Sequence, residues 1–379
     1  MLDASKIYKP KPTPNPQKSR KSLVASNTVA SPASIVELAR ALKNDPQLIF
    51  EHVYNNIDWE PTWGVQKGPL GALLAGMGGS FDQSMLLVEL LREAGFTAQY
   101  VMGQIDLSET ECDDWFNTAH VFAAYYYLQY ANIPGSFPYW SGTEWRMAMA
   151  HVWVEVVVGG TTYSLDPSRK TYTRKAAVSG LDTILGYSQS TFLSNAASGA
   201  TIDPSGDFIQ NMNTTNIHSD LATMTSNLIS YIDGNSIGSA SAGTATVDDV
   251  LGGQEIVPLT LPFTWSTSLP YEAPGDVPTI WTGDVPLAYK TTLQVQYPDS
   301  LGGWAIDETF TSDQLAGAEL TLTFDGSLYP LLKLNGVLIA PVRKRNFQEA
   351  GIRCFLTVNH NAYAFTVYPA VVAVFPVCG

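Results

Sequence analysis

The chain has 379 residues, of which 45% are apolar, 15% charged and 11% aromatic. This composition supports a sizeable buried core in about two or three domains and excludes disorder throughout. The 30 Gly and 23 Pro are too few for a fibrous or low-complexity protein. A formal net charge of −14 repels phosphate backbones, so we expect no nucleic-acid partner.

The cysteines and apolar runs exclude further classes. Cys112, Cys354 and Cys378 show no C-x-x-C spacing and no companion His cluster, so we expect neither a zinc site nor a disulfide framework, and at most one bridge. The longest apolar runs, such as residues 370–375, are far shorter than the roughly 20 residues of a membrane-spanning helix. The N-terminus lacks the apolar stretch of a signal peptide, so a soluble chain is predicted.

The first 30 residues form a basic, proline-rich lead-in. Alternating prolines favour an extended, polyproline-like segment. A basic segment can bind nucleic acid or anionic lipid, but Tyr8 is the single aromatic residue among its cations and offers little base stacking, so a flexible, solvated segment is predicted. The residues concerned are the cations Lys6, Lys9, Lys11, Lys18, Arg20 and Lys21, and the prolines Pro10, Pro12, Pro14 and Pro16.

Helical spacing follows over residues 34–42 and 46–57. After a loop rich in Trp and Gly, residues 80–94 form the most apolar helix of the chain. Its apolar side chains occupy nearly every azimuth, so this helix must be central and buried. Gly95 ends it, and the run over residues 97–102 has the composition of a strand.

The clearest strand signal is the hairpin over residues 151–166, with Gly159-Gly160 as its two-residue turn. That turn pairs Trp153 with Asp166 and His151 with Ser168, so His151 and Asp166 become diagonal neighbours on one face. Pro167 ends the pairing just after Asp166. A His oriented by an Asp is the base half of a nucleophilic triad.

Helical patterns return over residues 176–196 and 216–233, and the Gly- and Ser-rich stretch over 236–249 is typical of a surface linker. From about residue 255 the pattern is strand and turn, which fits a β-sandwich. The predicted strands cover residues 257–265, 291–297, 318–324, 331–334, 337–340, 355–359 and 364–375, with Asn335-Gly336 as a hairpin turn.

The start of a buried helix favours a nucleophile, because its free N–H groups and its dipole stabilise an anion. Here Gly78 and Gly79 allow close approach and Ser80 begins the helix. A nucleophile at a helix start, then a His on one strand and an Asp on the next, is the papain-like order. Taken alone, Ser80 would instead be a helix N-cap, with Gln83 completing a capping box.

Three blocks, over residues 78–103, 151–156 and 163–168, resemble the transglutaminase-like superfamily in order and spacing. The match is specific over about residues 45–170. The upstream stretch over 60–79 looks like the variant found in large bacterial secreted, repeat-containing proteins, and residues 320–340 are similar to a segment that often follows such domains. The resemblance implies an α+β, papain-like core and a secreted or cell-envelope location.

The resemblance places the general base on His151, the orienting carboxylate on Asp166 and the nucleophile on position 80, which is Ser where the family has Cys. A Cys pKa of about 8.5 can fall to roughly 3.5–7.5 beside an imidazolium and a helix start, whereas a hydroxyl must lose its proton to the His during attack. Two origins stay open: a natural Ser-type or inactive member, or a chain in which Cys was replaced by Ser for study.

Other residues are predicted to support the site or bind substrate, and each has a structural alternative. Trp153 and Glu155 share the His151 face, and Asp82 complements the helix dipole. Trp59, Trp63 and Gly64 either line a groove or form a packed loop. His120 is expected to be structural, and Cys112 lacks the cationic neighbours that would activate it. The supporting set is Trp63, Gly79, Asp82, Gln83, Trp153 and Glu155.

We therefore expect a lead-in over residues 1–30, a transglutaminase-like domain over 31–200, a helical connection and linker over 201–254, and a β-sandwich over 255–379. The expected activity is acyl transfer or amide hydrolysis on a peptide or protein, with no cofactor and no metal. The alternative is an inactive module of a larger secreted protein that binds a peptide or glycan or serves as scaffold. The oligomeric state stays open.

Overall fold

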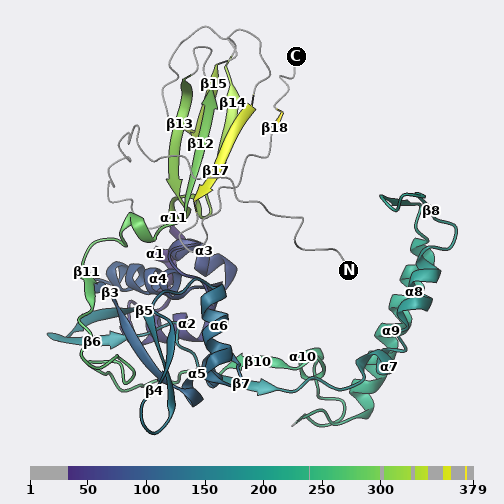
Figure 1. Ribbon diagram of the computed structural model, residues 1–379, viewed down its shortest axis with the longest axis horizontal. Helices are drawn as coiled ribbons and strands as arrows, with labels where there is room; N and C mark the ends of the chain where they lie inside the picture. Colours follow the sequence, from purple (N-terminus) through teal and green to yellow (C-terminus); the bar gives the residue numbers. More distant parts are fainter. Residues whose placement is uncertain are drawn as a thin grey trace.

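The computed structural model describes residues 33–238, 240–298, 303–325, 329–339, 353–359 and 372–373. The predicted lead-in, Cys378 and most of the last predicted strand lie outside these residues. The described part is a mixed helix and sheet structure, with a first domain, a projecting helical arm and a pair of C-terminal sheets (Figure 1).

An antiparallel sheet forms the centre of the first domain. Its strand order is β11 (Thr279–Trp281), β3 (Thr97–Ser108), β5 (Trp145–Val158) and β4 (Phe137–Trp140), and β6 (Thr161–Leu165) also pairs with β5. Val158 pairs with Thr161, and the φ angles of Gly159 and Gly160 are 60° and 84°. The two-residue turn is therefore confirmed, since both of its positions need the left-handed conformation that glycine adopts without strain.

Helices cover both faces of this sheet. The almost fully buried helix α4 (Ser80–Glu93) packs on the face that carries Val152, Val154 and Val156, together with α1 (Ala33–Ala41), α2 (Pro46–Asn56) and α3 (Gly68–Ala75). The short helices α5 (Glu109–Phe116) and α6 (Val121–Tyr130) pack on the face that carries Trp153. Side chains alternate between the two faces along β5, so the domain core has two layers, one on each face of the sheet. The prediction of a central buried helix is confirmed by α4.

A small parallel ladder positions the start of α4. Strand β1 (Asp58–Trp59) pairs with β2 (Met77–Gly78), and Trp59 lies opposite Gly78. The backbone N–H of Glu60 continues the ladder by donating to the carbonyl of Gly78 at 3.0 Å. This pairing brings the predicted Trp- and Gly-rich loop next to the first turn of the buried helix.

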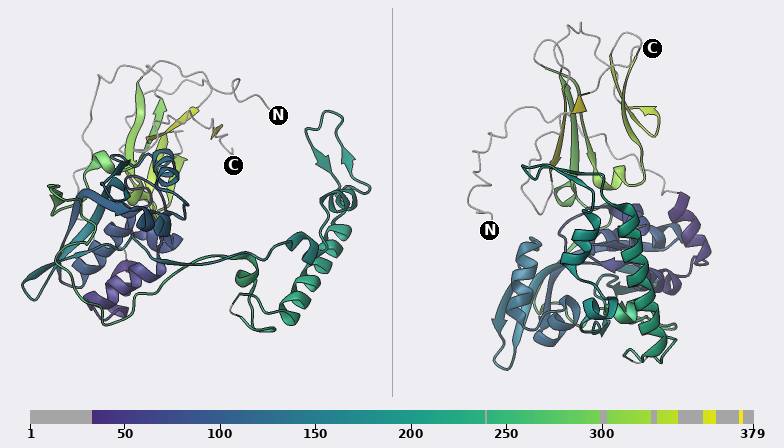
Figure 2. Two further views of the ribbon diagram at one scale, coloured as in Figure 1. Left: turned by 60° about the horizontal axis from the view of Figure 1, so that its bottom comes forward. Right: turned by 90° about the vertical axis from the view of Figure 1, so that its right-hand side faces the viewer.

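The helical arm, residues 176–252, leaves the first domain on a two-stranded ribbon and stands away from it (Figures 1 and 2). Strand β7 (Tyr172–Lys175) leads out and β10 (Gly253–Ile256) leads back. The predicted helices are confirmed, with the first one broken at Gly186, whose φ is 67°. The arm contains α7 (Leu181–Leu185), α8 (Gln189–Ala196), β8 (Thr201–Ile202), β9 (Ile209–Gln210), α9 (Thr214–Gly234) and, within the predicted linker, the start of α10 (Val247–Leu251).

The return segment, residues 257–291, runs back along the first domain. Asn55 binds both the N–H and the carbonyl of Leu259, and the Phe263 ring packs on Phe50 with centroids 5.3 Å apart. The strand predicted over 257–265 is wrong, because Pro258 and Pro262 supply no N–H for a ladder and the apolar side chains pack on α2 instead. The segment ends in a 3₁₀ turn, η2 (Leu287–Tyr289).

Two sheets form the C-terminal part and share a core that includes Val295, Phe310 and Leu332. The turn at Asn335-Gly336 is confirmed, with φ angles of 52° and 77°. One sheet has the order β13 (Trp304–Thr311), β12 (Thr292–Pro298), β17 (Arg353–Asn359) and β18 (Val372–Ala373), and the other has β14 (Leu320–Phe324), β15 (Pro330–Leu334) and β16 (Val337–Leu338).

The C-terminal sheets are joined to the first domain by polar contacts. Helix α11 (Ser312–Leu315) supplies Asp313, which receives Lys290 Nζ at 2.6 Å, and Thr291 donates its N–H to the Val65 carbonyl at 3.0 Å. The predicted division at residue 255 stays a prediction, and the return segment beyond it contacts the first domain. Among the helices that the structure describes, none combines the length and apolar character needed to cross a bilayer.

Candidate active site

Ser80, His151 and Asp166 lie together at the start of α4. Ser80 Oγ is 3.4 Å from His151 Nδ1, and His151 Nε2 is 2.8 Å from Asp166 Oδ2. His151 is 1% exposed and Asp166 5%, whereas Ser80 is half-buried. The hydroxyl is therefore the accessible end of a chain of polar groups that is otherwise buried.

The hydrogen bond to Asp166 fixes which His151 nitrogen can accept a proton. A carboxylate only accepts, so Nε2 carries the hydrogen and Nδ1 offers its lone pair toward the Ser80 hydroxyl. Burial raises the pKa of Asp166, but the His151 ring and the hydrogen bonds from His151 and Ser168 outweigh it and hold that pKa well below its ordinary value. Asp166 therefore remains ionised and can accept the hydrogen bond from His151 Nε2–H.

The Asp166 carboxylate is held from several directions. After β6 ends at Leu165, the chain turns, so that the backbone N–H of Ser168 donates to Asp166 Oδ1 at 2.9 Å and the Ser168 hydroxyl donates to the same oxygen at 2.8 Å. From the return segment, Tyr271 Oη donates to Oδ2 at 2.8 Å. The orientation of the carboxylate thus depends on a residue 105 positions away.

Two further side chains contact the Ser80 hydroxyl. Trp59 Nε1 donates to Ser80 Oγ at 3.3 Å, and Ser168 Oγ lies 3.1 Å from the same atom. The Trp59 ring packs on Trp115 with centroids 4.8 Å apart, and the Trp115 ring meets the His151 ring edge-on at 5.5 Å. These indoles form an aromatic wall beside the imidazole.

The capping of α4 differs from the prediction. Gly79, not Ser80, is the N-cap, and Asp82 rather than Gln83 closes the cap by accepting from the Gly79 N–H at 3.3 Å. A Cβ on Gly79 would lie 2.5 Å from Thr62 Oγ1, so the adjacent loop approaches too closely for any side chain there. Ser80 is consequently the first helical residue, and its backbone N–H has no acceptor within the helix.

Asp82 anchors a loop instead of facing the triad. Its Oδ1 accepts from the N–H groups of Gln66, Lys67 and Gly68 at 3.0, 3.0 and 2.8 Å. Burial raises the pKa of Asp82 to about 6, and the backbone donors only partly oppose it. Gln83 ties the β1–β2 ladder to the helix, since its Nε2 donates to the carbonyls of Asp58 and Gly78 at 3.0 and 2.9 Å.

The other predicted supporting residues are spread more widely. Trp153 is buried beside the His151 ring, with centroids 6.4 Å apart and planes 17° apart. Trp63 packs edge-on against Phe81 at 5.0 Å, and Glu155 accepts from Gln99 at 2.7 Å. Trp153 therefore lines the imidazole, whereas Trp63 and Glu155 make their contacts elsewhere.

The other cysteine and histidine side chains near the site have structural roles or are poor nucleophiles. Cys112 lies in helix α5, and burial together with Asp113 and Glu111 raises its pKa to about 12, which fits a poor nucleophile. His120 is the N-cap of α6 and accepts from the Phe122 N–H at 3.2 Å, a structural role. Cys112 and Cys354 are both free thiols. Within the described ranges, no group of three or more His, Cys, Asp and Glu side chains is placed to hold a metal ion.

Sequence reasoning missed Trp59, Ser168 and Tyr271 as contacts of the triad. Ser168 had a usable signal, because the hairpin register places it opposite His151. For Trp59 the sequence predicts either a groove or a packed loop, and neither implies a contact with Ser80. Tyr271 had no local signal, because it reaches Asp166 through the path of the return segment.

Residues 32–167 match the family model described as the transglutaminase-like superfamily. That range contains Ser80, His151 and Asp166, and it is a transglutaminase-like domain with a papain-like fold. No curated protein and no solved structure matches the chain at a significant level.

Proposed function

We propose that the transglutaminase-like domain transfers an acyl group from, or hydrolyses, an amide of a peptide or protein substrate, with Ser80 as the nucleophile. The observation that supports this most is the orientation of the His151 ring. Its Nδ1 faces Ser80 Oγ, while its Nε2 is hydrogen-bonded to Asp166. This is the arrangement that a hydroxyl needs, because the base must be oriented before the proton is removed.

The proposed reaction has two steps. Ser80 Oγ bonds to the substrate carbonyl carbon while its proton moves to His151 Nδ1; the C–N bond then breaks, and His151 returns the proton to the leaving amine. Water or a second amine next attacks the resulting ester, giving its proton through His151 to Ser80 as the C–O bond to Ser80 breaks. Asp166 orients the ring and stabilises the imidazolium throughout.

Two donors are available for the oxygen that becomes negatively charged. The Ser80 backbone N–H is free at the helix start, and the Trp59 Nε1–H already lies 3.3 Å from Ser80 Oγ. Donors of this kind stabilise a tetrahedral intermediate when they point at the oxyanion in a site that excludes water. The aromatic wall of Trp59 and Trp115 supports such exclusion.

One observation favours the alternative of an inactive binding or scaffold module. Ser168 Oγ lies 3.1 Å from Ser80 Oγ, which is closer than His151 Nδ1 at 3.4 Å. A hydroxyl has one proton, so Ser80 can donate to Ser168 instead of the imidazole. In that state the hydroxyl is a poor nucleophile, and the site would serve only to bind a peptide or glycan.

A serine-directed acylating or sulfonylating probe separates the two functions. The active enzyme should gain one adduct by intact mass, mapped to the peptide that contains Ser80, and Ser80→Ala should remove it. Ser190→Ala, an exposed serine on the arm, is the matched control and should label like the wild type. A correctly folded wild type that gains no adduct would leave the inactive module as the function.

A further inference from the structure

An exposed aromatic surface covers α6 and β4 and takes no part in the proposed chemistry. Helix α6 buries Val121, Ala124 and Leu128, while its opposite side carries aromatic residues at positions i, i+4 and i+8. The exposed rings are Phe122 at 39%, Tyr126 at 60%, Tyr127 at 38%, Tyr130 at 81%, Phe137 at 48% and Trp140 at 55%. Contiguous exposed rings of this kind mark an interaction surface.

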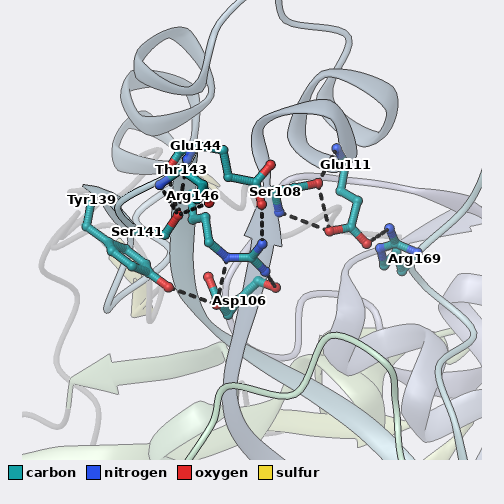
Figure 3. Close-up of polar contacts among 9 residues, drawn as sticks. All are labelled: Asp106, Ser108, Glu111, Tyr139, Ser141, Thr143, Glu144, Arg146 and Arg169. Atoms are coloured by element: carbon teal, nitrogen blue, oxygen red, sulfur yellow. Dashed lines mark hydrogen bonds and ion pairs between the residues drawn. The ribbon is translucent and has the colours of Figure 1, made fainter.

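Two of these exposed rings, Phe122 and Trp140, are joined into a row through Trp145. Phe122 packs on Trp145 with centroids 4.9 Å apart, and Trp145 packs on Trp140 at 5.7 Å. The strands beneath are fixed by Arg146, which donates to Asp106 Oδ2 at 2.9 Å and to Glu144 Oε1 at 2.6 Å (Figure 3). The surface is therefore preorganised, which lowers the entropy cost of binding.

Carboxylates lie near both ends of this row, at Glu109 and Glu144. His120 stacks on Phe122 at 5.3 Å and lies 3.4 Å from Glu109, and the Glu144 side chain, 45% exposed, follows at the other end. The single arginine of this stretch, Arg146, is already shared by Asp106 and Glu144. Residues 106–146 contain the acids Asp106, Glu109, Glu111, Asp113, Asp114 and Glu144, of which Glu111 is paired with Arg169 at 2.8 Å.

We propose that this aromatic surface, over residues 121–130 and 137–145, binds the basic, proline-rich segment of the same chain, residues 6–21. Proline-rich segments dock on aromatic surfaces through the flat faces of their rings. Lysine cations are attracted both to aromatic faces and to carboxylates. Residues 6–21 combine six cations with four alternating prolines, and this composition complements the rings and the acids of the surface.

The chain is long enough for this contact. Lys9 precedes the start of α1 by 24 residues, which span up to about 75 Å when extended. A domain of about 140 residues has a radius of gyration of about 14 Å, so the segment can reach any face of it. The helical arm is also acidic and has no Lys or Arg over residues 176–252, but its exposed apolar side chains are mainly aliphatic and offer fewer faces to proline and lysine.

The test uses a fluorescent peptide of residues 5–22 and the full-length chain in which all six cations of residues 6–21 are replaced by Gln. The peptide should bind this chain at least about tenfold more tightly than the wild type, whose own segment competes. Raising NaCl from 50 to 500 mM should weaken binding severalfold, since the charges are exposed. Adding Tyr126→Ser and Trp140→Ser should weaken it by about tenfold or more, because both rings are solvent-facing contacts.

Leu193→Ser and Phe208→Ser, exposed apolar residues of the arm, are the matched controls and should leave peptide binding unchanged. The proposal is wrong if the peptide fails to bind, or if the arm variants rather than the surface variants abolish binding. It is equally wrong if sedimentation shows a wild-type dimer that Trp140→Ser alone dissociates, because the surface would then join two copies. Preferential competition by a neutral oligosaccharide over the unlabelled peptide would also overturn it.

Discussion

A hydroxyl at position 80 sits where the geometry also suits a thiol. His151 Nδ1 and the free N–H groups of the helix start both lower the pKa of a cysteine placed there. Ser80→Cys is therefore expected to react with iodoacetamide at neutral pH at least about tenfold faster than an ordinary surface thiol. All variants carry Cys378→Ser, and the background from Cys112 and Cys354 should be low, since burial raises both thiol pKa values.

The reaction is followed by intact mass between pH 5 and pH 9. In the double variant Ser80→Cys with His151→Ala, the fast reaction should shift toward the pH range of an ordinary thiol. If Ser80→Cys shows no more reactivity below pH 8 than the double variant, the site does not activate a nucleophile.

Asp82 gives a pH dependence of stability with a definite sign. Its pKa rises from 3.8 to about 6 on folding, mainly through burial. Between these values the folded protein keeps a proton that the unfolded chain has lost, so the free energy of unfolding falls as pH rises, by about 3 kcal/mol in total. Asp82→Asn removes this part of the dependence.

The check is urea unfolding of wild type and Asp82→Asn at pH 4 and pH 7. The change in the free energy of unfolding between pH 4 and pH 7 should differ between the two proteins by about 2 kcal/mol, because pH 4 already lies slightly above the ordinary pKa of 3.8. Asp207→Asn, an exposed residue of the arm, should leave the pH dependence as it is. An unchanged dependence in Asp82→Asn would show that the buried carboxyl does not retain its proton.

At the scale of elements, the local parts of the site were predictable. Gly159-Gly160 sets the hairpin register, and that register alone brings His151 and Asp166 to one face. The apolar run after Ser80 predicts a buried helix whose start is the natural place for a nucleophile. The capping detail was missed, because choosing Gly79 over Ser80 depends on how closely the loop at Thr62 approaches.

The long-range parts were not predictable from one sequence. Trp59 reaches Ser80 through a two-residue parallel ladder, and such short strands have no periodic signal. Tyr271 reaches Asp166 through an irregular segment in which a strand is predicted only over residues 257–265, away from Tyr271 itself. In both cases tertiary packing, rather than local propensity, decides the conformation.

The return segment therefore contributes directly to the site. Tyr271→Phe keeps the ring but removes the hydroxyl that donates to Asp166 Oδ2. A hydrogen bond to a charged group contributes about 1.5–3 kcal/mol, so we expect a lower melting temperature and a labelling rate of Ser80 reduced about three- to tenfold. Tyr187→Phe, on an exposed tyrosine of the arm, is the control for both measurements.

If Tyr271→Phe matches the wild type in both melting temperature and labelling rate, the return segment does not position the carboxylate. A loss of stability alone, with an unchanged rate, would limit Tyr271 to a structural role.

At the scale of the whole molecule, the arm is separable from the first domain. Lys175 and Gly253 lie opposite each other at the end of its ribbon, and helices α7 and α9 bury none of their side chains. Replacing residues 176–252 with a short Gly-Ser turn is therefore expected to preserve folding and to leave the labelling rate of Ser80 within about twofold. Circular dichroism checks the folding and probe labelling checks the rate. Loss of folding or of Ser80 labelling would show that the arm is part of the catalytic domain.

The proposed chemistry depends on His151 acting as the base for Ser80, and the rate of Ser80 acylation tests this most directly. The second-order rate constant with a serine-directed probe should fall by about 100-fold or more in His151→Ala, as expected for loss of a general base. His218→Ala on the arm should leave it unchanged. Equal rates in wild type and His151→Ala, or an adduct mapped to a residue other than Ser80, would contradict the account.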